Sequence, residues 1–262
     1  MATTNTQSCT NIHEIAAGIY RINTPMMLPG DVAFSFNQYL IDDDEPLLFH
    51  TGLRQLFPLV NEAVASVLPA ARLRHIAFSH VEADECGALN QWLAAAPQSV
   101  PLCGTVAAMV SVNDLADRAP RALADGEVLS LGHHRVRWFD APHLPHGWDC
   151  GFLMEETTGT LLCGDLFTQP GRGEPALTGA DIPGEVIDER SLPCRDGHVM
   201  ELEHRLAQAR IGEGEQLHVI ARRGLALDEL IGRIDAELRL RRPRRRAPAQ
   251  PREFLAQEVL AA

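Results

Sequence analysis

The sequence contains no hydrophobic run of the roughly 18–20 residues that a membrane-spanning helix requires. Its first ten residues hold no basic residue and no apolar stretch, unlike a secretory signal. The six cysteines include no CxxC pair and no paired spacing, which favours reduced thiols over a disulfide framework. Together these absences predict a cytoplasmic protein with no membrane contact.

Positive charge is scarce over most of the chain. Residues 1–232 contain 15 arginines against 31 acidic residues, whereas residues 233–262 contain 8 arginines against 4. Because phosphate contacts require a basic surface, the acidic main body argues against nucleic acid as the principal partner. We interpret residues 241–262, rich in Arg, Pro and Ala, as a solvated tail that follows a domain covering residues 1–240.

Apolar residues, in contrast, are abundant and regularly spaced. The chain is 45% hydrophobic and 22% charged, which is enough apolar material for a sizeable core. Strands are predicted over residues 18–24, 34–41, 46–49, 73–79, 99–103, 136–140, 151–155, 160–163 and 216–221, and helices over 56–68, 89–96, 105–112, 199–210 and 226–240. This interleaving predicts an α/β or α+β fold with two sheets, each covered by helices.

A dense group of polar side chains follows the predicted strand at residues 73–79. His80, Glu82, Asp84 and Glu85 lie within six residues, directly before a helix. The end of a buried strand is where α/β proteins commonly place functional groups. Acidic residues at a helix start also interact favourably with the helix dipole. Taken alone, the segment is compatible with a metal site and with a solvated helix start.

Two later segments also place polar side chains at strand ends. His143 and His146 follow the strand that ends at Asp140. Asp165 follows the buried strand at residues 160–163, where a carboxylate is costly to desolvate unless it meets a cation. These segments shift the interpretation of the first one toward a metal site.

Taken in order, the three segments resemble the metallo-β-lactamase superfamily, and specifically its flavodiiron branch and the related stand-alone oxygen-binding di-iron proteins. That branch has H-x-E-x-D after a strand, followed by a distant His and then an Asp. Here the motif is His80/Glu82/Asp84, with His146 62 residues after Asp84 and Asp165 19 residues after His146. The resemblance covers residues 12–180 and implies an αββα four-layer sandwich with a dinuclear site at the sheet edges.

The resemblance also implies a ligand set. His80, Glu82 and His146 would hold one metal, Asp84 would serve the other, and Asp165 would bridge the two. A set rich in carboxylates and poor in imidazole favours Fe or Mn over Zn. The implied cofactor is therefore two Fe, with Mn or Zn as alternatives.

The chain departs from the family pattern at three positions. Glu85 replaces a His and could still ligate, so we rank it below Asp165 as a peripheral ligand. The family's early Asp-x-Gly begins here with His50, which either supports the site or is a polar turn residue. Arg223 stands where the family has its last His ligand, and the chain beyond about residue 182 follows the family poorly. His143 is a further candidate for supporting the metal or contacting a substrate.

The resemblance implies a non-haem di-iron protein that binds or reduces O2 or NO with electrons from a separate partner protein, or that senses gas or redox state. No flavin is expected in this chain, because a flavodoxin-like domain needs about 150 residues and only 82 follow residue 180. An alternative is a metal-dependent hydrolase of esters, thioesters or lactones, against which Glu82 counts. A third hypothesis is a degenerate, non-catalytic domain. A homodimer is left open.

Overall fold

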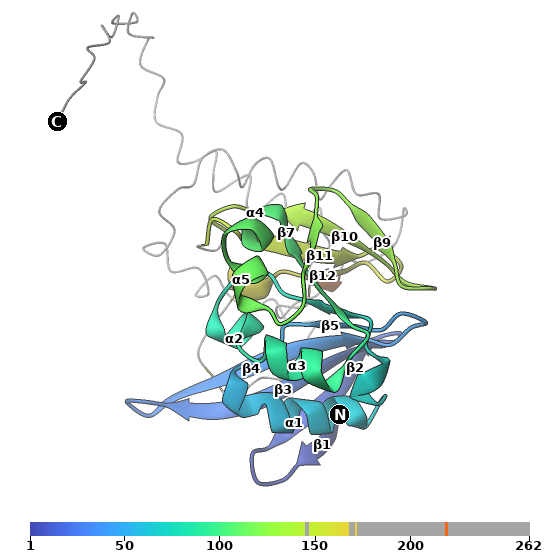
Figure 1. Cartoon of the computed structure of the whole chain (residues 1–262). Helices are drawn as coiled ribbons and strands as arrows, with labels where there is room; N and C mark the ends of the chain where they lie inside the picture. Colours follow the sequence, from blue (N-terminus) through green and yellow to red (C-terminus); the bar gives the residue numbers. More distant parts are fainter. Residues whose placement is uncertain (145–146, 168–170, 172–217, 220–262) are drawn as a thin grey trace, which may run out of the picture.

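The larger of two β-sheets in the computed structural model has eight strands in sequence order (Figure 1). The structure describes residues 1–144, 147–167, 171 and 218–219. The strands are β1 (Ala2–Asn5), β2 (Thr10–Ala16), β3 (Ile19–Leu28), β4 (Val32–Ile41), β5 (Leu47–Phe49), β6 (His75–Ala77), β7 (Val100–Gly104) and β8 (Arg121–Leu123). Neighbours are antiparallel from β1 to β5 and parallel from β5 to β8. The loops that follow β5, β6 and β7 therefore leave from one edge of this sheet.

The smaller sheet has the strand order β13-β12-β11-β10-β9. Its strands are β9 (Val128–Ser130), β10 (Arg135–Asp140), β11 (Gly151–Glu155), β12 (Thr160–Leu162) and β13 (His218–Val219). Only the pairing of β12 with β13 is parallel among the described strands of this sheet. The strands that we predicted in the middle of the chain are confirmed to within a few residues, whereas β1, β2, β8 and β9 were not predicted.

The helices are short. They are η1 (Arg54–Leu56), α1 (Phe57–Ala65), η2 (Ala70–Arg72), α2 (Ala83–Cys86), α3 (Leu89–Ala95), α4 (Thr105–Ala107), the π-helical turn η3 (Ala108–Val112), α5 (Asn113–Leu115) and η4 (Gly164–Phe167). Helix α1 carries Pro58 in its first turn, where the missing N–H costs nothing. No helix in the described part of the chain is long and apolar enough to cross a bilayer.

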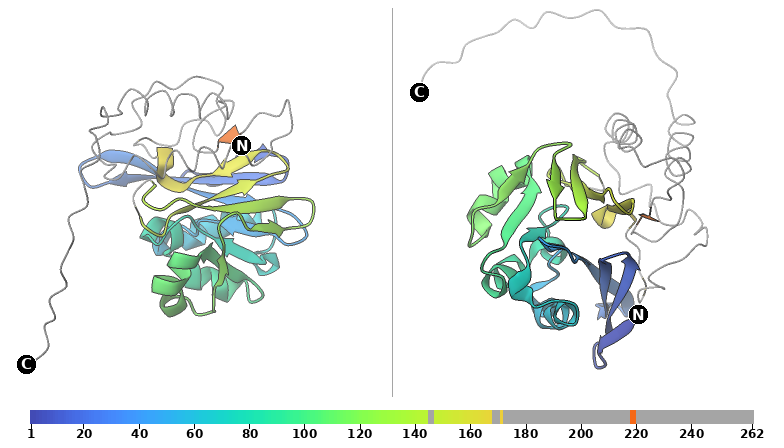
Figure 2. Two further views of the ribbon diagram at one scale, coloured as in Figure 1. Left: turned by 90° about the horizontal axis from the view of Figure 1, so that it is seen from above. Right: turned by 90° about the vertical axis from the view of Figure 1, so that its right-hand side faces the viewer.

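Two apolar cores hold the layers together. One lies between the larger sheet and the helices, and it includes Leu48 and Ile76 from the strands and Val64 and Trp92 from α1 and α3. The other lies between the two sheets and includes residues of β5, β6, β10, β11 and β12. The helices from η1 to α5 thus cover the outer face of the larger sheet (Figures 1 and 2), whereas η4 follows β12 of the smaller sheet. The helices that we predicted at residues 199–210 and 226–240 lie outside the described residues.

Gly151, the first residue of β11, lies against the ring of the buried Trp138. A Cβ atom at this position would lie 2.0 Å from Cζ2 of Trp138, whose Nε1 donates a hydrogen bond of 2.7 Å to Oδ1 of Asp140. The substitution Gly151→Ala is therefore expected to lower the free energy of unfolding by about 1–3 kcal/mol, as overpacking does. Urea unfolding would measure this loss, and an unchanged midpoint would contradict the packing described here.

Candidate metal centre

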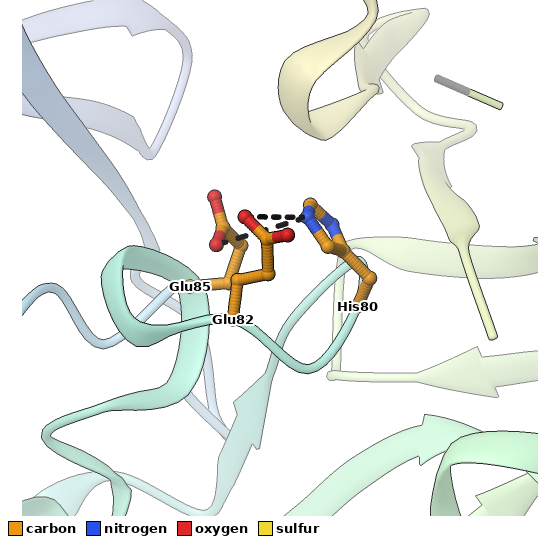
Figure 3. A group of neighbouring side chains, drawn as sticks. All are labelled: His80, Glu82 and Glu85. Carbon is orange, nitrogen blue, oxygen red and sulfur yellow. Dashed lines mark ion pairs between the residues drawn. The ribbon is translucent and has the colours of Figure 1, made fainter. Parts of the chain in front are cut away.

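The predicted ligands lie at the edge of the sandwich where several strands end. His80 follows β6, Glu82 lies at the start of α2, and Glu85 lies within that helix. Asp165 reaches the same place from η4, directly after β12 of the smaller sheet. Figure 3 shows the side chains of His80, Glu82 and Glu85 pointing toward one another from the loop and from α2.

Three carboxylates surround one nitrogen of His80. The Nε2 atom lies 3.7 Å from Oε2 of Glu82, 3.8 Å from Oε2 of Glu85 and 3.7 Å from Oδ2 of Asp165. These distances are too long for hydrogen bonds. Ligand atoms that each lie about 2.0–2.2 Å from one metal ion, as at zinc, are about 3–4 Å apart. The spacing around Nε2 therefore suits a shared cation.

The possible ligands form two overlapping groups. His80, Glu82 and Glu85 make the first, and Asp84, Glu85 and Asp165 make the second, with the ligand atoms of each group within 4.8 Å of one another. Glu85 belongs to both groups, although the family pattern led us to expect it at the periphery. Asp165 belongs to the second group, and its Oδ2 also lies 3.7 Å from Nε2 of His80 in the first group. The bridging role that the resemblance implies for Asp165 stays a prediction.

Glu85 is the most deeply buried carboxylate of the cluster. It is 2% exposed, and among the described residues its Oε2 has no hydrogen-bond partner. Burial, together with the nearby charges of Asp165 and Asp84, raises the pKa of Glu85 to about 10. A buried anionic site of this kind is costly unless a cation neutralises it. The donor set thus fits one or two divalent metal ions, which would keep the carboxylates ionised.

Hydrogen bonds to Thr51 connect helices α2 and α3 to the loop that follows β5. The N–H of Thr51 donates to the carbonyl of Glu85 at 2.7 Å, and the N–H of Ala88 donates to Oγ1 of Thr51 at 3.1 Å. Nε1 of the buried Trp92 donates to the carbonyl of Thr51 at 3.1 Å. The position of the Glu85 backbone is therefore set by the larger sheet and by α3, which limits its freedom to move.

The segment that carries His146 is only partly described. His146 lies outside the described residues, but a Cβ atom at its neighbour Gly147 would lie 3.9 Å from Cβ of His80. Oδ2 of Asp149 accepts a hydrogen bond of 3.0 Å from the N–H of Val81, which ties this segment to the loop of His80. The backbone at Gly147 therefore lies directly beside the cluster.

The remaining candidates differ in their positions. The side chain of His143 is exposed, and its backbone N–H donates to the carbonyl of Gly147 at 2.8 Å. Arg223 lies outside the described residues. His50 is buried beside the cluster, and its Nε2 lies 3.0 Å from Oγ of Ser79. We did not predict Ser79 or Asp149, although the position of Ser79 directly before a ligand at a strand end was a usable signal.

A family model described as ODP family beta lactamase matches residues 34–181, which is more than half of the chain. The chain belongs to this family. The putative diflavin flavoprotein A 1 of Nostoc sp. is 27% identical over 136 residues, which cover 51% of this chain and 23% of that protein. The rubredoxin-oxygen oxidoreductase of Megalodesulfovibrio gigas is 26% identical over 139 residues, covering 52% and 34%. This member of the ODP family thus spans about a quarter to a third of these relatives.

Solved structures confirm the fold expected of an ODP family member. The metal-soaked Flv1 flavodiiron core from Synechocystis sp. superposes with a TM-score of 0.68 at 17% identity, covering 88% of this chain and 61% of that one. A fragment of the putative diflavin flavoprotein A 5 from Nostoc sp. superposes with a TM-score of 0.69 at 14% identity, covering 88% and 96%. The fold is therefore the metallo-β-lactamase-like sandwich that we predicted.

Proposed function

We propose that this chain is the metal-binding core of a non-haem di-iron protein that binds or reduces O2 or NO. The observation that carries the proposal is the pair of overlapping ligand groups that share the buried Glu85. Membership of the ODP family supports it, as does the likeness to a rubredoxin-oxygen oxidoreductase. If the chain reduces O2 or NO, the electrons would come from a separate redox protein. If it is a gas or redox sensor, the same site would bind the molecule without turnover.

The donor chemistry favours iron. The described cluster offers one imidazole, from His80, and four carboxylates, from Glu82, Asp84, Glu85 and Asp165. Oxygen-rich sets suit harder ions than the imidazole-rich sets typical of zinc. Two ferrous ions held here would supply two electrons to a bound diatomic molecule.

Burial divides the cluster into a closed and an open side. The side chains of His80 and Glu85 are 1% and 3% exposed, whereas those of Glu82 and Asp165 are 47% and 23% exposed. The first two would exclude water from the base of the site. Glu82 and Asp165 line the side from which a small molecule would enter.

Metal reconstitution tests this proposal. The chain is purified without oxygen, stripped of metal and reloaded with Fe²⁺, Mn²⁺ or Zn²⁺ in parallel, and the bound metal is quantified by elemental analysis. We expect about two Fe per chain, together with O2 or NO uptake that requires both the iron and a reduced rubredoxin. This expectation follows from the two overlapping ligand groups.

Two other results would contradict the proposal. Retention of Zn²⁺ in place of Fe²⁺, with hydrolysis of ester or thioester substrates, would identify a hydrolase of the same superfamily. Failure to bind any of the three metals would identify a non-catalytic domain. Stoichiometric iron that binds NO without turnover would instead select the sensor form of the proposed function.

A further inference from the structure

A continuous chain of buried hydrogen bonds leads from the larger sheet to His80. Nδ1 of His80 lies 2.8 Å from Oγ of Ser79, and the same oxygen lies 3.0 Å from Nε2 of His50. His80, Ser79 and His50 are 1%, 2% and 6% exposed. Water therefore has little access to these contacts, so the polar atoms of the three side chains must find their hydrogen-bond partners within the protein.

The direction of each hydrogen bond in this series follows from the protonation of His50, the residue farthest from the metal cluster. Burial lowers the pKa of His50 to about 3, so the ring is neutral and carries one N–H. A hydrogen bond to the backbone of Asn37 acts in the opposite direction and raises this pKa. A backbone partner that raises the pKa of an imidazole is a carbonyl that accepts its N–H. Since Nε2 of His50 faces Ser79, the N–H that bonds to the backbone of Asn37 is assigned to Nδ1, which leaves Nε2 to accept from the hydroxyl of Ser79.

The remaining bond is then determined. The single hydroxyl proton of Ser79 is directed at His50, so Oγ of Ser79 can only accept from Nδ1 of His80. This leaves the lone pair of His80 on Nε2, the atom that lies 3.7–3.8 Å from the three carboxylates. A neutral imidazole ligates through its unprotonated nitrogen.

We propose that His50 acts through Ser79 as a positioning residue, which holds His80 in the tautomer that presents Nε2 to the metal. The inference rests on the proposed metal site. We call the hydrogen-bonded series His50–Ser79–His80 the relay. His50 stands where the family usually has an aspartate, so a neutral ring occupies this position in place of a carboxylate.

The surrounding backbone is built to hold this arrangement. His50 has a φ of +65°, a conformation that few residues other than glycine adopt, and its ring stacks on Phe49 with centroids 4.4 Å apart. Gly164, which precedes Asp165, packs so closely that a Cβ atom there would lie 2.6 Å from Oγ of Ser79. Ser79 is thus enclosed between the two sheets, which restricts its hydroxyl to the partners described.

Two variants test the relay in the full-length chain with Zn²⁺ as the probe. Ser79→Ala removes the hydroxyl, and His50→Phe keeps a ring against Phe49 but removes its nitrogens. We expect each to weaken Zn²⁺ binding by about 10–100-fold in chelator competition, the usual effect of removing a partner that orients a ligand. His80→Ala should weaken it further.

The matched controls remove similar groups elsewhere. Ser99 is also buried, and its hydroxyl donates to the carbonyl of Ala96 at 2.8 Å. His75 lies at the opposite end of β6 from His80 and contacts Glu45. Ser99→Ala and His75→Phe should leave the Zn²⁺ affinity unchanged, even where they lower stability, because neither contacts the cluster.

Nuclear magnetic resonance of the ring nitrogens provides a readout that a purely structural role would not change. In the unmodified Zn²⁺-loaded chain, we expect His80 to carry its proton on Nδ1, with slow exchange against water, and Ser79→Ala should accelerate that exchange. A proton on Nε2 of His80 would overturn the relay even if the variants fail to fold. Folded variants that bind Zn²⁺ as tightly as the unmodified chain would overturn the relay alone. Absence of metal binding by the unmodified chain would overturn the proposed site together with it.

Discussion

Glu85→Gln is expected to reduce the metal content of the chain more than any other single carboxylate substitution in the cluster. Glu85 belongs to both ligand groups, so its loss affects both metal positions. It is also 2% exposed, so water replaces its carboxylate poorly. We expect metal affinity to fall by more than about 100-fold, beyond the range seen when only a supporting residue is removed.

Glu82→Gln is the matched control for this prediction. Glu82 occurs in one group, and its side chain is 47% exposed, so water can take its place as a ligand. Chelator competition should therefore show one weakened and one retained metal position. Asp165→Asn provides the decisive comparison, because the family pattern alone ranks Asp165 above Glu85. Loss of both ions from Asp165→Asn, with both retained in Glu85→Gln, would restore that ranking.

The strand ends that carry His80 and Asp165 are predictable from the sequence, because the backbone alone determines their geometry. The apolar runs before His80 and Asp165 predicted buried strands, and β6 and β12 confirm both. The two sheets pack through a common core, so side chains that leave these strand ends meet at one edge. The convergence of His80 with Glu82, Glu85 and Asp165 follows from this arrangement.

Burial and pairing across the chain were not predictable in the same way. Strand β1 is short and polar, and it exists because it pairs with β2 and lies near α1, where Asn5 donates to Glu62 at 3.0 Å. Strand β8 is shorter still, with three residues, and begins with exposed residues. No local pattern distinguishes the buried Glu85 from the exposed Glu82, because their difference depends on which side of α2 faces the sheets.

The second large effect is expected at Glu155, which stabilises the hairpin between β11 and β12. Its fully buried carboxylate accepts hydrogen bonds from the N–H groups of Thr157 and Thr158 at 2.8 and 2.7 Å, and from Oγ1 of Thr158 at 2.5 Å. Nδ1 of His134 lies 3.1 Å from Oε1 of Glu155. Glu155→Ala leaves these donors without an acceptor, so we expect the free energy of unfolding to fall by about 3–5 kcal/mol.

The contribution of Glu155 should also depend on pH. Burial alone would raise the pKa of this carboxyl, but the hydrogen bonds from Thr158 and Thr157 outweigh it and lower the pKa below 4.5. The unfolded chain then binds more protons than the folded one as the pH falls below about 4.5. The stabilisation is therefore complete above that pH and is lost as the pH falls through the lower, folded-state value. The side chain of the Glu155→Gln variant cannot titrate. The difference in free energy of unfolding between this variant and the unmodified chain should therefore narrow as the pH falls below about 4.5.

Glu156→Ala is the control for Glu155→Ala, because it also removes a negative charge from the hairpin but does not remove a buried carboxylate. The side chain of Glu156 is 21% exposed and pairs with Arg137 at 2.6 Å and Arg135 at 3.4 Å. Ion pairs near the surface contribute only about 0.2–1 kcal/mol to stability, so removing Glu156 should cost little. Urea unfolding at pH 7 should therefore show a much smaller loss for Glu156→Ala than for Glu155→Ala. Equal losses of unfolding free energy in the two variants, or a Glu155→Gln deficit that does not narrow as the pH falls well below about 4.5, would show that the buried carboxylate does not stabilise the hairpin through its charge.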